Sequence, residues 1–209
     1  MQEISLLVSV ASCRDWKPQF GISLALLADR LASNRLGGTL ARVRYSIKAQ
    51  ASCLSISREE ALTLAEKDGF THWLSLDDDM GFPPDAVDRL IKHDLPIVAA
   101  NYRRKQKKVA GICLSTNGEV INSEGKTGLE EVGWIGGGCS LVDVEKVKVV
   151  RPPRFSVLWV EERKSYMSED YFFSMKLREN GIKIFCDHDL SNDMQHIGDV
   201  AYTFPEEVK

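Results

Sequence analysis

Three consecutive carboxylates, Asp77, Asp78 and Asp79, follow directly after the apolar run at residues 73–76. The run predicts a buried strand, and ligands of open α/β sheets bind at the carboxyl ends of strands. Adjacent carboxylates repel one another unless a cation lies among them, and Mg²⁺ and Mn²⁺ take oxygen ligands of this kind. Taken alone, the triplet is explained better by an acidic turn that caps the next helix. The rest of the chain favours a metal–diphosphate site.

A second acidic pair, Glu169 and Asp170, comes directly after Ser168, late in the chain. Ser168 is suited to cap a helix, and carboxylates are favourable in a first helical turn, so the pair alone indicates no more than a helix start. A His-x-Gly sequence, from His196 to Gly198, follows the next apolar run. The order of triplet, pair and histidine is more specific than any of the three.

Alternating strand and helix patterns must position these groups. Periodicity predicts strands at residues 4–10, 39–47, 72–76, 97–100 and 182–186, and helices near 20–31, 57–68, 85–91 and 169–179. Ser57 and Glu60 predict a capping box at the start of the second helix. The glycines at 136–138 precede another apolar run and let the backbone approach a ligand closely. This alternation indicates an α/β nucleotide-binding architecture.

Length and composition are those of an ordinary globular protein. The chain has 209 residues, 44% of them hydrophobic and 27% charged, and a net charge of −3, which suits one moderate domain better than two small ones. The acidic balance argues against nucleic-acid binding by bulk charge. One basic run, at residues 103–108, is either a solvated loop or a site for an anionic ligand or acceptor.

The five cysteines are widely spaced, and no C-x-x-C pair occurs among them. This pattern predicts reduced thiols and a cytoplasmic location rather than a disulfide framework or a zinc site. The first residues lack the basic segment of a signal peptide. No stretch approaches the roughly 20 apolar residues of a transmembrane helix, so we expect no transmembrane segment.

The motif order resembles the nucleotide-sugar-dependent glycosyltransferases of the GT-A fold, particularly family 2 and its short phage and bacterial members. Residues 72–101 are similar to that family's strand, DxD motif, helix and following strand; residues 135–142 are similar to its glycine-containing strand, and residues 167–190 to its x-Glu-Asp segment. The resemblance implies a single GT-A domain over residues 1–209, an α/β/α three-layer sandwich with a mostly parallel mixed sheet. Residues 1–101 would form the nucleotide-sugar-binding half and residues 102–209 the acceptor-binding half.

The same resemblance implies a metal-dependent enzyme that moves a sugar from a nucleoside-diphosphate sugar to an acceptor hydroxyl. Asp77, Asp79 and His196 would hold Mn²⁺ or Mg²⁺, with Asp79 as the expected direct ligand. Asp170 would be the general base of an inverting reaction, and Glu169 its neighbour that positions the acceptor. Nucleotide-sugar binding would involve Ser12, Arg14, Arg58, Asp77 and Asp78, with Gly137 and Gly138 along the sugar or acceptor pocket.

Several points stay open at this stage. Asp78 is the variable middle position of the DxD motif, or takes the role of Asp77 if the register is shifted by one. His188 is an alternative to His196 as a ligand, and residues 157–167 are a candidate closing loop. A UDP-sugar is the expected donor, whereas the acceptor could be a polysaccharide, a lipid-linked sugar or a modified DNA base, and the oligomeric state is unknown. The alternative functions are a nucleotidyltransferase and a non-catalytic module that binds sugar nucleotides or nucleic acid.

Overall fold

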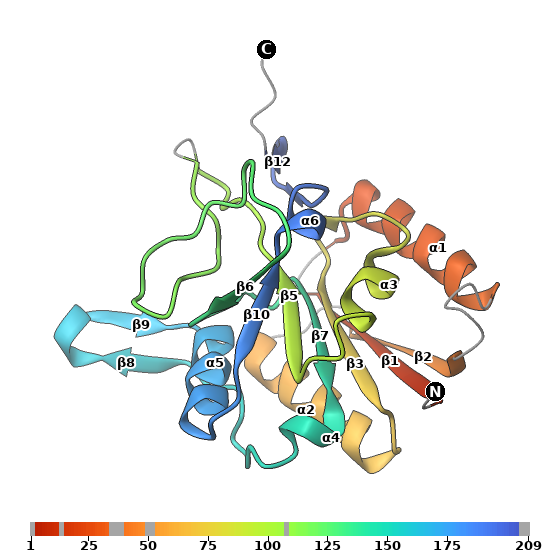
Figure 1. Ribbon diagram of the computed structural model, residues 1–209, viewed down its shortest axis with the longest axis horizontal. Coiled ribbons are helices and arrows are strands. Elements are labelled where there is room, and N and C mark those ends of the chain that lie inside the picture. The colour runs from red at the N-terminus through yellow and green to blue at the C-terminus, as the bar shows by residue number, and fades with distance from the viewer. Residues whose placement is uncertain (1–2, 13–14, 34–39, 49–52, 107–108, 205–209) are drawn as a thin grey trace.

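A seven-stranded mixed sheet forms the centre of the computed structural model, which describes residues 3–12, 15–33, 40–48, 53–106 and 109–204 (Figure 1). The strand order is β2-β1-β3-β7-β5-β10-β6. Strands β2, β1, β3, β5 and β10 run in one direction, whereas β7 and β6 are antiparallel to their neighbours. The bounds are β1 Ile4–Ala11, β2 Leu40–Lys48, β3 His72–Asp77, β5 Ile97–Ala100, β6 Leu129–Val132, β7 Cys139–Asp143 and β10 Ile184–Asp187.

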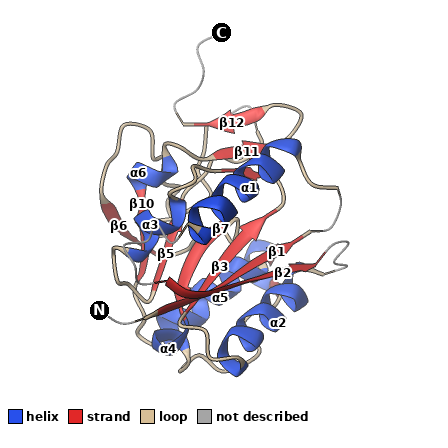
Figure 2. Cartoon of the chain, turned by 90° about the vertical axis from the view of Figure 1, so that its right-hand side faces the viewer, coloured by secondary structure: helices blue, strands red, loops and turns tan. Residues whose placement is uncertain are grey.

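Helices cover both faces of this sheet, which gives the three layers seen in Figures 1 and 2. One face packs against α1 Pro18–Ala32, α3 Ala86–Ile91 and α6 His188–Ser191. The other packs against α2 Leu54–Lys67, α4 Val144–Val147 and α5 Glu169–Glu179. The predicted α/β/α sandwich with a mostly parallel mixed sheet is confirmed.

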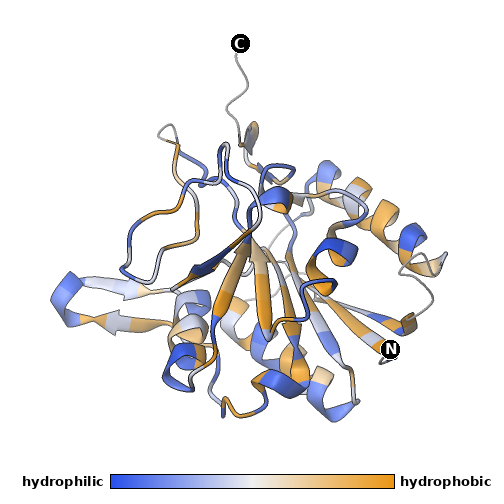
Figure 3. Ribbon diagram, viewed as in Figure 1, coloured by the Kyte–Doolittle hydropathy of each residue, from blue (hydrophilic) through white to orange (hydrophobic). Residues whose placement is uncertain are grey.

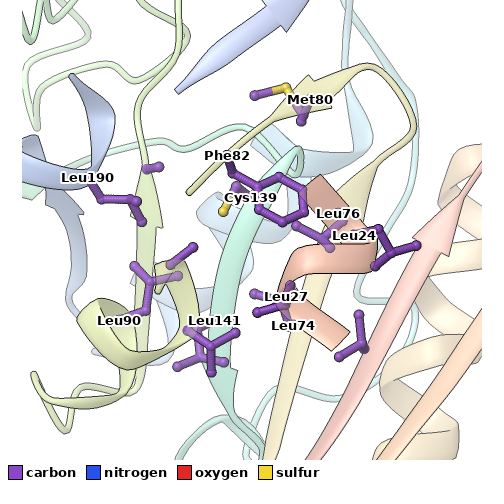
Figure 4. Close-up of a cluster of buried hydrophobic side chains, with 14 of the residues drawn as sticks. Leu24, Leu27, Leu74, Leu76, Met80, Phe82, Leu90, Cys139, Leu141 and Leu190 are labelled. Carbon is purple, nitrogen blue, oxygen red and sulfur yellow. The ribbon is translucent and has the colours of Figure 1, made fainter. Parts of the chain in front are cut away.

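Strand β3 shows why an uninterrupted apolar run forms a central strand. Successive side chains of a strand point to opposite faces of the sheet. Leu74 and Leu76 therefore join the core under α1, where Figure 4 shows them with leucines of α1 and β7, while Trp73 joins the core on the opposite face. Because both faces are covered by helices, every position of the run is apolar or small, and Figure 3 shows hydrophobic colours concentrated in the central strands.

The predicted strands and helices are confirmed, with boundaries that differ by no more than three residues. The capping box at Ser57 is wrong, because α2 begins at Leu54 after Cys53. Ser57 lies inside the first turn, and its hydroxyl donates to the Cys53 carbonyl oxygen at 3.3 Å. A serine whose hydroxyl bonds the carbonyl oxygen four residues back fits within a helix. The Ser-x-x-Glu pattern therefore does not mark the start of α2.

Two smaller sheets flank the large one. Strands β4 Met80–Gly81, β11 Gln195–Ile197 and β12 Ala201–Thr203 form a three-stranded sheet beyond the end of β3. Strands β8 Leu158–Val160 and β9 Ser165–Met167, with the 3₁₀ turn Glu161–Arg163 between them, form a hairpin that extends beside α5 (Figure 1). Among the described residues, no helix combines the length and the apolar character of a membrane span.

The buried Arg154 ties the segment after α4 to helix α2. Its side chain is 1% exposed, and its guanidinium lies 2.7 Å from Glu59, 2.6 Å from Glu66 and 2.6 Å from the Thr63 hydroxyl. Two carboxylates thus compensate one buried positive charge, which is the condition under which such a charge is tolerated.

We expect Arg154→Met to lower the free energy of unfolding by about 3 kcal/mol, because the change leaves two partly buried carboxylates without their partner. Urea unfolding measures this effect. Arg44→Met is the control: the exposed Arg44–Asp68 pair, 2.6 Å apart, should contribute no more than about 1 kcal/mol. Equal effects of the two substitutions would contradict this account of Arg154.

Candidate functional site

The acidic triplet lies where strand β3 leaves the central sheet. Asp77 is the last residue of β3, and the next two aspartates form a turn into β4. Strand β4 pairs with β11 so that Met80 lies opposite His196. The backbone N–H of Ile197 donates to the Asp79 carbonyl oxygen at 2.7 Å. This short pairing brings a C-terminal imidazole to the carboxyl end of a central strand.

The unprotonated nitrogen of the His196 ring faces a carboxylate oxygen of Asp79, with no hydrogen bond between the two. His196 Nδ1 is 2.9 Å from the Arg103 carbonyl oxygen; because that oxygen can only accept, Nδ1 carries the proton. The other nitrogen, Nε2, is 3.6 Å from Asp79 Oδ1. Burial lowers the pKa of His196, although Asp79 opposes that effect, so the neutral ring is favoured. A neutral imidazole whose second nitrogen is bound to a backbone carbonyl is the usual form of a metal-ligating histidine.

Arg58 links the end of β3 to the start of α5. Its side chain is 3% exposed, Nη2 donates to Asp77 Oδ1 at 2.7 Å, and Nη1 donates to Glu169. Burial lowers the pKa of Arg58, but the negative charges of Asp77 and Glu169 more than offset it and the pKa is raised. Removal from bulk water raises the pKa of Asp77, and Arg58 opposes that rise. The guanidinium is therefore engaged by two carboxylates of the site itself.

The two acidic residues at the start of α5 have different surroundings. Glu169 is buried and bonded to Arg58, and desolvation raises its pKa. Asp170 is only partly buried, and its Oδ1 accepts hydrogen bonds from the Ser168 hydroxyl and from the Tyr171 backbone N–H, the latter at 2.8 Å. The N-terminus of a helix stabilises an ionised carboxylate. Asp170 is thus the more accessible member of the pair.

The glycines before β7 provide space beneath this cluster. A Cβ atom on Gly137 would overlap the guanidinium of Arg58, and one on Gly138 would lie 2.8 Å from the Tyr102 hydroxyl and 3.1 Å from Asp77 Oδ2. The Gly138 N–H also donates to the Tyr102 hydroxyl at 3.1 Å. Close packing against Arg58 and Tyr102 therefore accounts for both glycines, and their predicted place along a sugar or acceptor pocket stays a prediction.

Ser12 and Asp78 lock the loop after β1 to the acidic turn. The Ser12 hydroxyl donates to Asp78 Oδ2 at 2.5 Å, and both residues are buried. The Lys17 N–H donates to the Asp78 carbonyl oxygen at 3.1 Å. Asp78 thus has an internal structural contact, which suits the middle position of the DxD motif. Arg14, predicted to bind the nucleotide, lies outside the described residues.

The described part of the basic run, residues 103–106, folds back onto the site. Arg103 is 6% exposed and lies over the Tyr202 ring, 5.7 Å from its centroid. Arg104 donates to the Tyr171 hydroxyl at 3.2 Å, and Lys105 Nζ bonds Asp79 Oδ2. Each of these three charges has a partner within the chain, and the role of the basic run as a site for an anionic ligand or acceptor stays a prediction.

Tyr102 and Lys105 are site residues that the sequence reasoning missed. The Tyr102 ring packs edge-on against the His196 ring, with centroids 5.1 Å apart, and Lys105 bonds Asp79. Both follow β5 directly, and the rule that ligands bind at the carboxyl ends of parallel strands applies to β5 as it does to β3. Applied to residues 101–105, this rule would have indicated that Tyr102 and Lys105 lie near the site.

The remaining described histidines have structural partners. His188 lies 2.9 Å from Glu130 and 2.9 Å from Ser123, His93 lies 2.8 Å from Asp187, and His72 lies 2.9 Å from the Thr71 hydroxyl. Within the described part of the chain, no three His, Cys, Asp or Glu side chains are grouped so as to hold a metal ion. Among the described residues, Asp77 is bonded to Arg58 through Oδ1, whereas Asp79 lies 3.6 Å from His196. The role of Asp77 as a third metal ligand stays a prediction.

Comparison with known proteins supports the fold. No protein-family model matches the sequence, and no curated protein matches it. Among solved structures, the chain is similar to A197 from STIV with a TM-score of 0.62 and 16% identity, over 99% of this chain and 97% of that one. This likeness shows a shared fold.

Two more distant structures are glycosyltransferases. GalNAc-T7 with UDP, GalNAc and Mn²⁺ matches at 13% identity over 90% of this chain, with a TM-score of 0.48; this chain spans 43% of that one. A Drosophila beta-1,4-galactosyltransferase 7 complex with manganese, UDP-Gal and xylobiose matches at 13% identity over 93% of this chain and 71% of that one, with a TM-score of 0.47. Likenesses this distant carry no argument about function.

We expect Gly137→Ala to destabilise the protein by about 1–3 kcal/mol, because the added methyl group overlaps the buried guanidinium and forces it to move. Chemical denaturation measures the change. Gly21→Ala in α1 is the matched control, since nothing lies within 4 Å of its Cβ position and alanine favours a helix. A Gly137→Ala variant as stable as the wild type would show that Arg58 can shift without cost.

Proposed function

We propose that this chain is a divalent-metal-dependent glycosyltransferase of the GT-A kind, which moves a sugar from a nucleoside-diphosphate sugar to an acceptor hydroxyl. The observation that carries the proposal is the pairing of Asp79 with a neutral His196 at the end of β3, connected through Asp77 and Arg58 to the acidic start of α5. The motif order in the sequence and the α/β/α architecture support the same function. A UDP-sugar is the donor class to test first.

The residues at the end of β3 fit a hard divalent ion in part. Asp79 and His196 would hold it, since a carboxylate oxygen and an imidazole nitrogen that lie 3.6 Å apart are both groups that ligate metal ions. Such ions commonly take one or two protein ligands and complete their shell with water and substrate phosphates, so two protein ligands are enough for an ion of this kind. A bound Mn²⁺ or Mg²⁺ would supply positive charge against the departing nucleoside diphosphate.

Asp170 is proposed as the base that takes the acceptor proton. The acceptor oxygen attacks the anomeric carbon, the bond from that carbon to the diphosphate oxygen breaks, and the hydroxyl proton passes to the Asp170 carboxylate. Attack from the face opposite the leaving group gives inversion. The Ser168 hydroxyl and the Tyr171 N–H both donate to Asp170 Oδ1, which holds the carboxylate in a fixed orientation for proton transfer.

Arg58 is proposed to hold Glu169 and Asp77 in place rather than to contact the donor. Because Glu169 is bonded to Arg58, its side chain is fixed next to the proposed base.

The hairpin β8–β9 leads directly into Ser168, and its Trp159 and Tyr166 are 49% and 71% exposed. A closing element at this place would shield the donor from water, as transfer to a sugar rather than to water requires.

The metal-dependent donor site is tested by thermal unfolding with UDP-glucose, UDP-galactose and UDP-N-acetylgalactosamine, with and without Mn²⁺. Ligands that bind only the folded state raise the melting temperature by mass action. We expect at least one donor to raise it in the presence of Mn²⁺, and His196→Gln and Asp79→Asn to abolish that increase. Lys146→Met, which changes a lysine at the opposite end of β7 from the site, is the control. Stabilisation by a nucleoside triphosphate alone would favour a nucleotidyltransferase instead.

Asp170→Asn tests the proposed base. Loss of general-base assistance should lower turnover by about 10²- to 10⁴-fold, while Mn²⁺-dependent donor binding stays within about twofold of the wild type because the substitution preserves shape. Steady-state transfer or donor-hydrolysis rates, together with the thermal shift, separate the two effects. Unchanged turnover in this variant would remove Asp170 from the mechanism.

A further inference from the structure

We propose that Lys105 is the resident counter-ion of Asp79 and that a divalent cation must displace it, so that this side chain sets the metal affinity of the site. The inference rests on the metal site of the proposed function and adds a competitor to it. The observation behind it is that Lys105 Nζ bonds Asp79 Oδ2, while the other oxygen of the same carboxylate faces His196 Nε2 at 3.6 Å.

The position of Lys105 is fixed by the backbone around it. The Arg104 N–H donates to the Ala110 carbonyl oxygen at 2.8 Å, and the Ile112 N–H donates to the Tyr102 carbonyl oxygen at 3.0 Å. The Arg103 carbonyl oxygen is the partner of His196 Nδ1. One short loop thus holds the proposed ligand through its backbone and delivers the ammonium through its side chain.

The His-x-Gly sequence lies directly beside this lysine. A Cβ atom on Gly198 would lie 3.4 Å from Lys105 Cδ and 3.1 Å from the Tyr202 ring. The first distance is an ordinary van der Waals contact, so the stem of Lys105 passes next to Gly198 while its ammonium reaches Asp79. The loop after β5 and the strand that carries His196 are packed to bring the ammonium to the acidic turn.

Competition follows from the charges. A carboxylate that already holds an ammonium has part of its negative charge compensated, and a second cation at the same carboxylate is repelled by the first. The lysine and Asp79 side chains are 29% and 19% exposed, so the pair is partly screened by water and its strength is modest. A divalent ion can displace the ammonium, but only at some cost in affinity.

The test is Mn²⁺ binding to the nucleotide-free, full-length protein, measured by electron paramagnetic resonance or calorimetry for the wild type and for Lys105→Met. Methionine keeps the length of the stem and removes the charge. We expect Mn²⁺ to bind about two- to fivefold more tightly to Lys105→Met, the factor that corresponds to loss of a partly exposed ion pair. Lys105→Arg, which keeps the charge, should stay within about twofold of the wild type.

Lys146→Met is the matched control, because Lys146 also forms a carboxylate pair, with Asp94 at 2.5 Å, but at the opposite end of β7. It should leave Mn²⁺ affinity unchanged, and thermal unfolding confirms that each variant is folded. Mn²⁺ binding of equal or lower affinity in Lys105→Met would overturn the inference and leave the proposed function standing. Absence of Mn²⁺ binding in the wild type and in Lys105→Met alike would overturn both the inference and the metal site.

Discussion

The buried guanidinium of Arg58 is the interaction on which the site depends. A charge removed from water is costly unless carboxylates compensate it, and here Asp77 and Glu169 do so from two distant parts of the chain. This pairing joins the end of β3 to the start of α5. It also accounts for Gly137, because a side chain at that position would occupy the space of the guanidinium. An arginine, a glycine and two acidic motifs thus act as one structural unit.

The five carboxylates of the two acidic motifs divide into two groups around that unit. Asp77 and Glu169 are engaged by Arg58, and Asp78 is engaged by Ser12. Asp79 faces the His196 imidazole and the Lys105 ammonium, and Asp170 is partly exposed at the first turn of α5. The first group makes structural contacts, and the proposed function assigns the chemistry to the second. This division explains why the chain places carboxylates next to one another when only some of them can meet a substrate.

The sequence was sufficient to predict the layers and the place of the acidic turn at the end of β3. Strand β3 was predictable because a strand buried on both faces must be apolar throughout, and the acidic turn was predictable because it follows that strand. The place of β7 between β3 and β5 was not predictable. Strands that are neighbours in the sequence usually lie side by side in a sheet, and no local sequence pattern indicates that another strand is inserted between them. The partners of Arg58 and the inward fold of Lys105 depend on tertiary packing, which residue spacing does not encode. Ser57 failed as a cap because the same residue type also fits inside a first turn.

The most direct test of the central claim is the position of the metal ion itself. A crystal grown with Mn²⁺ and UDP, with diffraction recorded on both sides of the manganese absorption edge, locates the ion by its anomalous signal. The account predicts one peak within coordination distance of an Asp79 carboxylate oxygen and of His196 Nε2, in contact with the diphosphate. A diphosphate bound at the end of β3 with no manganese peak beside Asp79 and His196 would contradict it.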